Sequence, residues 1–376
     1  MLYYPYSKLQ NNQKKYSYKG GIVFMEKRYT IREHILDVYQ KQARQLPLDT
    51  SSIEKYEQWK EKVQNTLKEI SGINQMERCD LTPKGLDEEI FKDHIRKKVI
   101  IQTEPKVWMP LYILIPTDLK NGEKRPVIIA PHGHGCGGKA GIAGNTKNTQ
   151  IQKGIENYQC DYGLRLVREG YIVFCPDARG SGERMEDVSV NSNVDNILTS
   201  ACNDLNFAAI SLGQSLLGMM TWDLIRLVDY VETLESCDLS KIACVGFSGG
   251  GLQTLWLSAL DERIKAAYIS GYFYTIQSAL LHTHRCGCNF VPNLWKYVDL
   301  GDIAALIAPR PLFIESGKSD KLNGTMGIES AANQVQITKK AYTLFGKENH
   351  IQHLIFEGTH VFHGEALSSF LYHCFH

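Results

Sequence analysis

The chain contains Gly-Phe-Ser-Gly-Gly at residues 246–250, and this short motif limits the possible folds more than any other feature. The apolar run Ile242 to Val245 before it is typical of a buried strand, and Leu252 to Leu260 after it is typical of a helix. A serine at a sharp turn from strand to helix forms a nucleophile elbow, with its hydroxyl above the sheet edge. Glycines on both sides let the two arms approach closely, and we expect strained backbone angles at Ser248. An ordinary glycine-rich turn is the alternative, but the strand and the helix around it favour the elbow.

Length and charge exclude several classes of protein. The 376 residues are enough for one large α/β domain with an appendage. There are 42 basic and 41 acidic residues, a net charge of +1, so no bulk charge attracts nucleic acid or an anionic membrane. No apolar stretch approaches the roughly 20 residues of a membrane-spanning helix. Ten cysteines without a framework spacing indicate reduced thiols and a cytoplasmic protein.

Predicted strands and helices alternate through most of the chain. A β-hairpin is predicted over Lys97–Thr103 and Val107–Pro116, and continuous helical regions over Ile151–Glu169 and Asp195–Leu234. Further strands are predicted at Pro126–Ala130, Tyr171–Cys175, Lys265–Ser270, Pro311–Ser316 and Gln352–Phe356. This alternation indicates the α/β class: a doubly wound, mostly parallel sheet with active-site loops at the carboxyl ends of its strands and an antiparallel edge.

The amino-terminal part of the chain precedes this sheet. Residues 1–24 contain no apolar h-region, and we expect them to be disordered or a non-native extension, with translation starting at Met25. Two amphipathic helices, Thr30–Arg44 and Ser51–Ile70, indicate a helical appendage over residues 25–80. The appendage docks on the main domain or, alternatively, binds a partner. Residues 81–376 form the predicted α/β domain.

A serine hydroxyl attacks a carbonyl only when a base accepts its proton and a third group orients that base. In sheets with this elbow, the order along the chain is serine, acid, histidine. Asp320 lies on the loop after the strand predicted at Pro311–Ser316, and it is therefore the predicted acid. Glu315 lies inside that strand and Asp302 on the helix before it, so both are worse placed.

The base must come from the six histidines that follow Asp320. His360 comes directly after the last predicted strand, where its side chain can reach the elbow, and it is the predicted base. His363 is the runner-up, in the expected first turn of the terminal helix. His373 and His376 lie at the far end of that helix and are too remote.

Acyl transfer also builds negative charge on a carbonyl oxygen, which a pair of backbone N–H groups must stabilise. One predicted donor is Gly249, the residue after the serine. The other is His134, in the glycine-rich loop that follows the strand at Pro126–Ala130. This loop lacks the Gly-Lys-[Ser/Thr] ending of a phosphate-binding P-loop. We therefore interpret it as the second half of an oxyanion hole.

Motifs along much of the chain carry a family resemblance. They are His132–Gly135, Asp177–Gly182, Trp222–Asp223, Gly246–Gly250, Cys288–Pro292, Ile307–Leu312 and Gly358–Gly364. Together they resemble the α/β-hydrolase superfamily, and more narrowly the dienelactone-hydrolase-like and acetyl-xylan-esterase-like bacterial hydrolases. The resemblance covers roughly Glu89 to Phe375. It implies the α/β-hydrolase fold, and it makes the elbow and the first and last of these motifs catalytic.

Three other stretches invite a functional interpretation. His282–Cys288 contains His-x-His and Cys-x-Cys, but it lacks the usual zinc spacing and a second cysteine pair, so we predict a loop and no metal. Asp177 and Arg179 are expected to form a structural loop interaction beside the site. The aromatic residues Tyr272–Tyr274 follow a strand end, and they either line a substrate pocket or belong to the core.

The predicted function is that of a serine esterase acting on a small ester, with Ser248 as nucleophile, His360 as base and Asp320 as acid. No cofactor is expected. The expected substrates are esters of short-chain acids, including acetylated carbohydrates. Neither nucleic acid nor a membrane is an expected partner. A homo-oligomer is compatible with the sequence. The alternatives are a prolyl-oligopeptidase-type peptidase and a non-catalytic binding protein on the same fold.

Overall fold

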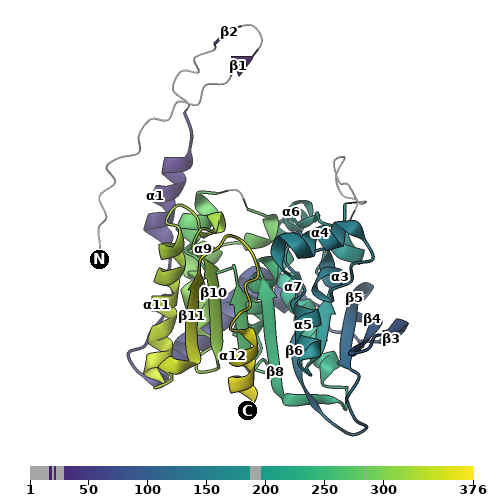
Figure 1. Ribbon diagram of the computed structural model, residues 1–376. Helices are drawn as coiled ribbons and strands as arrows, with labels where there is room; N and C mark the ends of the chain where they lie inside the picture. Colours follow the sequence, from purple (N-terminus) through teal and green to yellow (C-terminus); the bar gives the residue numbers. More distant parts are fainter. Residues whose placement is uncertain (1–16, 19–20, 23–28, 187–195, 284) are drawn as a thin grey trace. The chain divides into compact units, whose positions relative to one another are not determined.

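A mixed sheet of nine strands, counted over the residues that the structure describes, forms the centre of the unit that contains residues 42–376 (Figure 1). The computed structural model describes residues 17–18, 21–22, 29–186, 196–283 and 285–376. By its internal contacts the chain divides into two units, Met1–Lys41 and Gln42–His376. The sheet belongs to the second unit.

In the first unit, two short strands, β1 (Ser17–Tyr18) and β2 (Gly21–Ile22), pair antiparallel. The helix α1 (Arg32–Gln42) follows and extends to the unit boundary. The prediction for residues 1–24 falls otherwise outside the described residues, and so does Met25.

The order of strands in the sheet is β11-β10-β9-β8-β6-β7-β5-β4-β3. The five pairs from β11 to β7 are parallel, and the three pairs from β7 to β3 are antiparallel. The strands are β3 (Lys84–Ile90), β4 (His94–Glu104), β5 (Val107–Pro116), β6 (Arg125–Ile129), β7 (Ile172–Pro176), β8 (Cys237–Phe247), β9 (Ala266–Ser270), β10 (Leu312–Gly317) and β11 (Ile351–Phe356). The predicted doubly wound sheet and its antiparallel hairpin are confirmed.

Helices cover both faces of this sheet. They are α2 (Ile53–Ser71), α3 (Gly138–Ile142), α4 (Thr149–Tyr158), α5 (Tyr162–Arg168), α6 (Cys202–Ser211), α7 (Leu216–Val231), α8 (Gly249–Leu260), α9 (Leu294–Tyr297), α10 (Leu300–Ala305), α11 (Ile328–Leu344) and α12 (Leu367–Phe375). Within β8, Ala243 and Val245 join the core under α5 and α12, whereas Ile242 and Cys244 join the core under α7. Successive residues of a strand point to opposite faces, so a nearly continuous apolar strand serves both cores. Among the described residues, no helix is long and apolar enough to cross a bilayer.

Two predicted helical regions are interrupted in the structure. The first, predicted over Ile151–Glu169, is two helices, because Gln159 takes a left-handed conformation (φ 53°) that ends α4 before α5 begins. The second, predicted over Asp195–Leu234, begins only at Cys202, Asp195 being outside the described residues, and it breaks between α6 and α7 at Gly213 (φ 77°). Ser215 then caps α7 by accepting a hydrogen bond from Gly218 N. Glycine and serine at this break are sequence signals for a helix end and a helix start.

The helix α2 belongs to the same unit as the sheet. Most of the apolar stripe predicted on this helix is buried, namely Tyr56, Trp59, Val63 and Leu67, whereas Ile53 at its first turn is exposed. The Tyr56 hydroxyl donates to Ala305 O at 2.7 Å, which ties α2 to the end of α10. The carboxyl end of α2 packs so closely on α7 that a β-carbon at Gly218 would lie 2.1 Å from Ser71 O.

The loop after β7 is held by buried charges. Asp177 and Arg179 were expected to interact within this loop, and each instead pairs with a charged residue outside it. Asp177 accepts from Lys139 Nζ at 2.6 Å. Arg179 donates instead to Asp223 of α7, which also accepts from Arg184 at 2.7 Å and is only 2% exposed. Burial opposes the charge on Asp223, but the two guanidinium groups outweigh it and hold the pKa of this carboxyl below its ordinary value of 3.8.

We predict that Asp223→Asn destabilises the fold strongly, because it leaves two buried guanidinium groups without their shared counter-charge. The expected loss in the free energy of unfolding is on the order of 3 kcal/mol. Urea unfolding at neutral pH measures it, and Glu235→Gln at an exposed position is the control. A stability equal to that of the control would contradict the prediction.

The wild type and Asp223→Asn, compared by urea unfolding as a function of pH, test the pH dependence of stability. Since the pKa of Asp223 is lower in the folded chain than in the unfolded chain, its contribution to stability is present above about pH 4 and is lost as the pH falls further. Asp223→Asn should therefore lose less stability than the wild type between about pH 4 and pH 2.

Candidate active site

Ser248 lies at the turn between β8 and α8. Its backbone angles, φ 55° and ψ −119°, are strained for a residue with a side chain, as the motif predicts. Ser248 N donates to Ser270 O at 2.8 Å, and Leu252 N donates to Ser248 O at 3.0 Å. One bond ties the turn to the neighbouring strand β9, and the other is the first bond of α8.

The two flanking glycines make this turn possible. A β-carbon at Gly246 would lie 2.2 Å from Gly250 O, and one at Gly250 would lie 2.1 Å from Pro131 O. Both distances are far below van der Waals contact. The strand and the helix can therefore meet only because Gly246 lacks a side chain, and the loop after β6 can approach the helix only because Gly250 lacks one.

The structure brings Ser248, His360 and Asp320 together. His360 Nε2 lies 2.9 Å from Ser248 Oγ, and His360 Nδ1 lies 2.7 Å from Asp320 Oδ2. The side chain of Asp320 is 3% exposed and that of His360 is 21% exposed, so the carboxylate is shielded while the imidazole reaches the surface of the site. Both distances are hydrogen-bond distances, and together they form a chain from carboxylate to hydroxyl.

Pairing between the strands positions the two loops that carry the histidine and the acid. The strands β10 and β11 are parallel neighbours, so their carboxyl ends meet. Beyond them, Lys318 N donates to Phe356 O and Ser319 N donates to Gly358 O, each at 2.9 Å. Asp320 Oδ1 accepts from Leu322 N at 2.7 Å, which orients the carboxylate so that Oδ2 meets the imidazole.

The imidazole of His360 is also held by packing. The ring of Phe247, the residue before the serine, lies 4.6 Å from that of His360 between centroids. A β-carbon at Gly271, after β9, would lie 3.3 Å from His360 Cε1. These contacts come from two neighbouring strand ends and limit where the ring can turn.

Glu315, Asp302 and His363, the alternative candidates for the acid and the base, have other partners in the structure. Glu315 is fully buried and accepts from the Tyr268 hydroxyl at 2.6 Å and from the backbone N–H groups of His363 and Gly364 at 3.0 Å. Asp302 lies in a capping box of α10 and pairs with Arg44. The ring of His363 meets Glu365, and His363 precedes α12 instead of forming its first turn.

Glu315 is a positioning residue that the sequence analysis missed. Its carboxylate fixes the backbone three and four residues after His360, so it holds the loop that carries the imidazole. A carboxylate inside an otherwise apolar, buried strand was the available signal, because a buried charge requires partners.

The loop after β6 passes directly over the elbow. A β-carbon at Gly133 would lie 2.6 Å from Phe247 O and 3.1 Å from Ser248 Cβ. The buried His132 fixes this loop: its Nε2 accepts from Ala178 N and its Nδ1 lies near Gly133 O, both at 3.0 Å. Burial lowers the pKa of His132, so the neutral ring required by these contacts is favoured. Gln253 of α8 donates to His132 O at 3.1 Å and was also missed.

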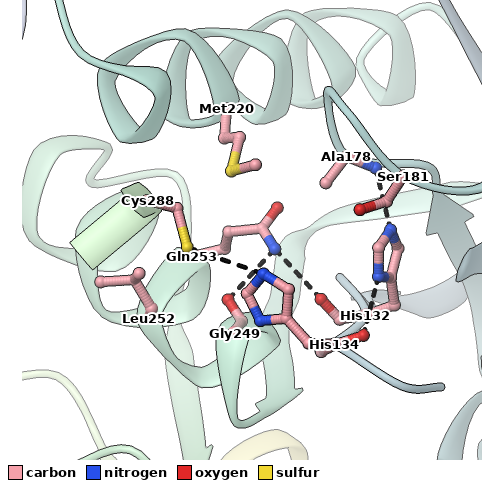
Figure 2. A pocket seen from close by; sticks show the side chains of 10 residues that line it. His132, His134, Ala178, Ser181, Met220, Gly249, Leu252, Gln253 and Cys288 are labelled. Carbon is pink, nitrogen blue, oxygen red and sulfur yellow. Dashed lines mark hydrogen bonds between the residues drawn. The ribbon is translucent and has the colours of Figure 1, made fainter. Parts of the chain in front are cut away.

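Figure 2 shows a small cavity behind this loop, lined by His132, His134 and Gln253 among others. Its volume is about 10 Å³, room for about one water molecule, so it does not hold a substrate. A larger hollow of about 900 Å³ lies at the other ends of the strands, beside Arg125 and Tyr171. The aromatic residues Tyr272–Tyr274 are buried, and the Tyr272 hydroxyl donates to Asn289 Oδ1 at 2.9 Å.

Comparisons with known proteins agree with this architecture. A curated relative, "Putative hydrolase YtaP" of Bacillus subtilis (strain 168), is 24% identical over 262 residues, which are 69% of this chain and 81% of the relative. A crystal structure of a "putative acetyl xylan esterase" from Bacteroides fragilis NCTC 9343 is 18% identical, with a TM-score of 0.71 over 88% of this chain and 83% of that one. A glucuronoyl esterase from Solibacter usitatus is 16% identical, with a TM-score of 0.60 over 88% and 98%.

At these identities the solved structures show a shared fold, and they confirm the α/β-hydrolase fold expected from the motifs. The family model described as the abhydrolase family matches residues 26–354, which are most of the chain and include the elbow and all of the sheet except the last two residues of β11. The chain belongs to the abhydrolase family.

Proposed function

We propose that the chain is a serine hydrolase that cleaves carboxylic esters. One observation carries the proposal: Asp320, His360 and Ser248 form an unbroken chain of hydrogen bonds at a strained elbow. The three side chains come from three loops, and the serine and the histidine are 112 residues apart in the chain. A nucleophile, a base and an orienting acid need this arrangement.

In the proposed reaction, Ser248 Oγ attacks the ester carbonyl while His360 Nε2 takes its proton. The tetrahedral intermediate collapses, and the imidazolium returns that proton to the leaving alcohol. Water then attacks the acyl-enzyme with the same base, which releases the acid and restores the serine. Asp320 keeps the imidazole in the tautomer that presents Nε2 to the hydroxyl, and it stabilises the positive ring.

The oxyanion of each intermediate needs N–H donors at the elbow. Gly249 N is at the start of α8, and the close approach of Gly133 to the elbow brings the loop with His134 beside it. We therefore retain the backbone N–H groups of Gly249 and His134 as the proposed oxyanion hole. His132, Gln253 and Glu315 position the loops around it.

For the substrate, we propose an ester of a carbohydrate: an acetylated sugar or an ester of a sugar acid. Support comes from the names of structural neighbours, which include acetyl xylan, glucuronoyl and methyl esterases. The proposed compartment is a reducing cytoplasm, where the ten free cysteines would stay reduced.

Ser248→Ala should abolish hydrolysis of p-nitrophenyl acetate and leave the fold intact. We expect kcat to fall by about 10⁴-fold or more, because the remaining groups have no nucleophile to activate. Circular dichroism checks the fold, and a fluorophosphonate probe should label the wild type at Ser248 only. A wild type that neither reacts with the probe nor hydrolyses esters would favour the non-catalytic binding protein.

Gly133→Ala tests the oxyanion loop. The new methyl group meets Phe247 O and Ser248 Cβ, so the loop must move away from the serine. We expect kcat for p-nitrophenyl acetate to fall by about 10²–10³-fold, the usual effect of losing one oxyanion donor. Gly85→Ala is the matched control, because nothing lies within 4 Å of a β-carbon there. Equal activity of the two variants would remove this loop from the proposed oxyanion hole.

A substrate panel tests the proposed class. Acetylated xylo-oligosaccharides, methyl esters of glucuronic acid, p-nitrophenyl esters of increasing chain length and short proline-containing peptides are compared by kcat/KM. We expect kcat/KM to be higher for the carbohydrate esters than for the simple p-nitrophenyl esters. Among the simple esters, kcat/KM should fall as the acyl chain becomes longer. Cleavage of the peptides in preference to every ester would instead support a prolyl-oligopeptidase-type peptidase.

A further inference from the structure

Four side chains that could hold a metal ion converge beside the loop of the proposed oxyanion hole. They are His134, Cys202, Cys286 and Cys288, and their ligand atoms all lie within 4.8 Å of one another. His134 comes from the loop after β6, Cys202 is the first residue of α6, and the other two flank Gly287 at the short 3-10 helix η4 (Gly287–Asn289). Figure 2 shows the His134 ring and the Cys288 sulfur turned toward one another.

The distances suit a tetrahedral zinc ion. His134 Nε2 lies 3.4 Å from Cys202 Sγ and 3.7 Å from Cys288 Sγ. Around zinc, with Zn–N of about 2.0–2.1 Å and Zn–S of about 2.3 Å, ligand nitrogen and sulfur atoms lie about 3.6 Å apart. Three cysteines and one histidine complete four-fold coordination, the composition of closed structural zinc sites. We propose that these four residues bind one structural zinc ion.

The surrounding residues already hold the ligands in place. Gly287 N donates to Asn203 Oδ1 at 2.6 Å, which fixes the Cys-Gly-Cys turn against α6. Asn289 Nδ2 donates to Cys286 O at 3.0 Å and lies 3.7 Å from Cys288 Sγ. A β-carbon at Gly287 would lie 2.8 Å from Cys202 O, so only glycine lets the two cysteine-bearing segments meet. N–H groups aimed at ligand sulfur atoms are typical outer partners of a metal site.

This proposal reverses the prediction of no metal in the stretch His282–Cys288. That prediction rested on the unusual spacing and on the lack of a second cysteine pair, whereas the two further ligands, His134 and Cys202, are far away in the chain. His134 is 68 residues from Cys202 and 154 residues from Cys288. His284 lies outside the described residues, and the proposed site does not use it.

The ion would also hold the loop that carries His134 against Gly249, the residue after the serine. A β-carbon at Gly249 would lie 3.0 Å from His134 Nδ1, so the His134 ring packs against the residue after the serine. Zinc at Nε2 would then fix the loop that carries the proposed His134 N–H donor. This consequence depends on the proposed function, whereas the metal site itself does not.

Metal analysis of the full chain tests the site. The protein is expressed with added zinc, purified without chelators and analysed by inductively coupled plasma mass spectrometry. We expect about one zinc ion per chain in the wild type. The zinc content should be at least tenfold lower in Cys202→Ser and in Cys288→Ser. Cys237→Ser is the matched control, because Cys237 is equally buried but lies at the start of β8. A wild type that contains no stoichiometric zinc, or cluster variants that keep it, would overturn the proposal.

Two measurements on the wild type cover the case in which the variants fail to fold. A mercurial reagent should release one equivalent of zinc to a chromophoric chelator. Cobalt in place of zinc should give the thiolate charge-transfer and intense visible bands of a tetrahedral site. If alkylation and mass spectrometry instead show a disulfide among the three cysteines and no metal, the site does not exist.

Different results would contradict the zinc site and the proposed esterase function. Ser248→Ala should bind zinc like the wild type and hydrolyse no ester. If the site also supports the oxyanion loop, chelator treatment should lower the melting temperature and reduce kcat for p-nitrophenyl acetate more than tenfold. A protein that binds zinc and hydrolyses nothing would contradict the esterase alone.

Discussion

The close approach of β8 and α8 at Ser248 is the constraint on which the site depends. Gly246, Gly250 and Gly133 each face a backbone oxygen at a distance that no β-carbon tolerates. The strand, the helix and the loop after β6 are therefore pressed together around one serine. Its strained backbone angles are the cost of exposing the hydroxyl, and they persist because the buried cores on both faces of β8 hold the two arms.

The parallel pairing of β8 through β11 converts that turn into a site. Parallel neighbours end at the same edge, so the loops after β8, β10 and β11 meet, and each contributes one residue of the hydrogen-bonded chain. Glu315 shows how much of the surrounding structure serves this geometry. A carboxylate buried inside β10 fixes the backbone just beyond His360, and the inward-facing Tyr268 completes its hydrogen bonds. The proposed zinc ion would perform the same task on the other side of the serine, for the loop with His134.

The prediction from sequence was most successful where local rules apply. Alternating strands and helices, the elbow and the hairpin all follow from periodicity and from glycine, and the structure confirms them. The break at Gln159 was missed because a left-handed glutamine carries no sequence signal, unlike the glycine at the break before α7. The edge strand β3 was missed for a related reason. It is exposed on both faces, so its sequence lacks the apolar alternation by which strands are recognised.

By itself, the sequence determined the fold class, the elbow and the order in which Ser248, Asp320 and His360 follow the strands, because these depend on residues close together in the chain. Only the tertiary structure decided which distant side chains meet. It placed His360 and Asp320 on one line with the serine, gave Asp177 and Arg179 separate partners, and brought His134 to three cysteines. Such contacts arise when helices pack on both faces of a sheet. The packing of the whole chain sets their distances, and no short stretch of sequence records them.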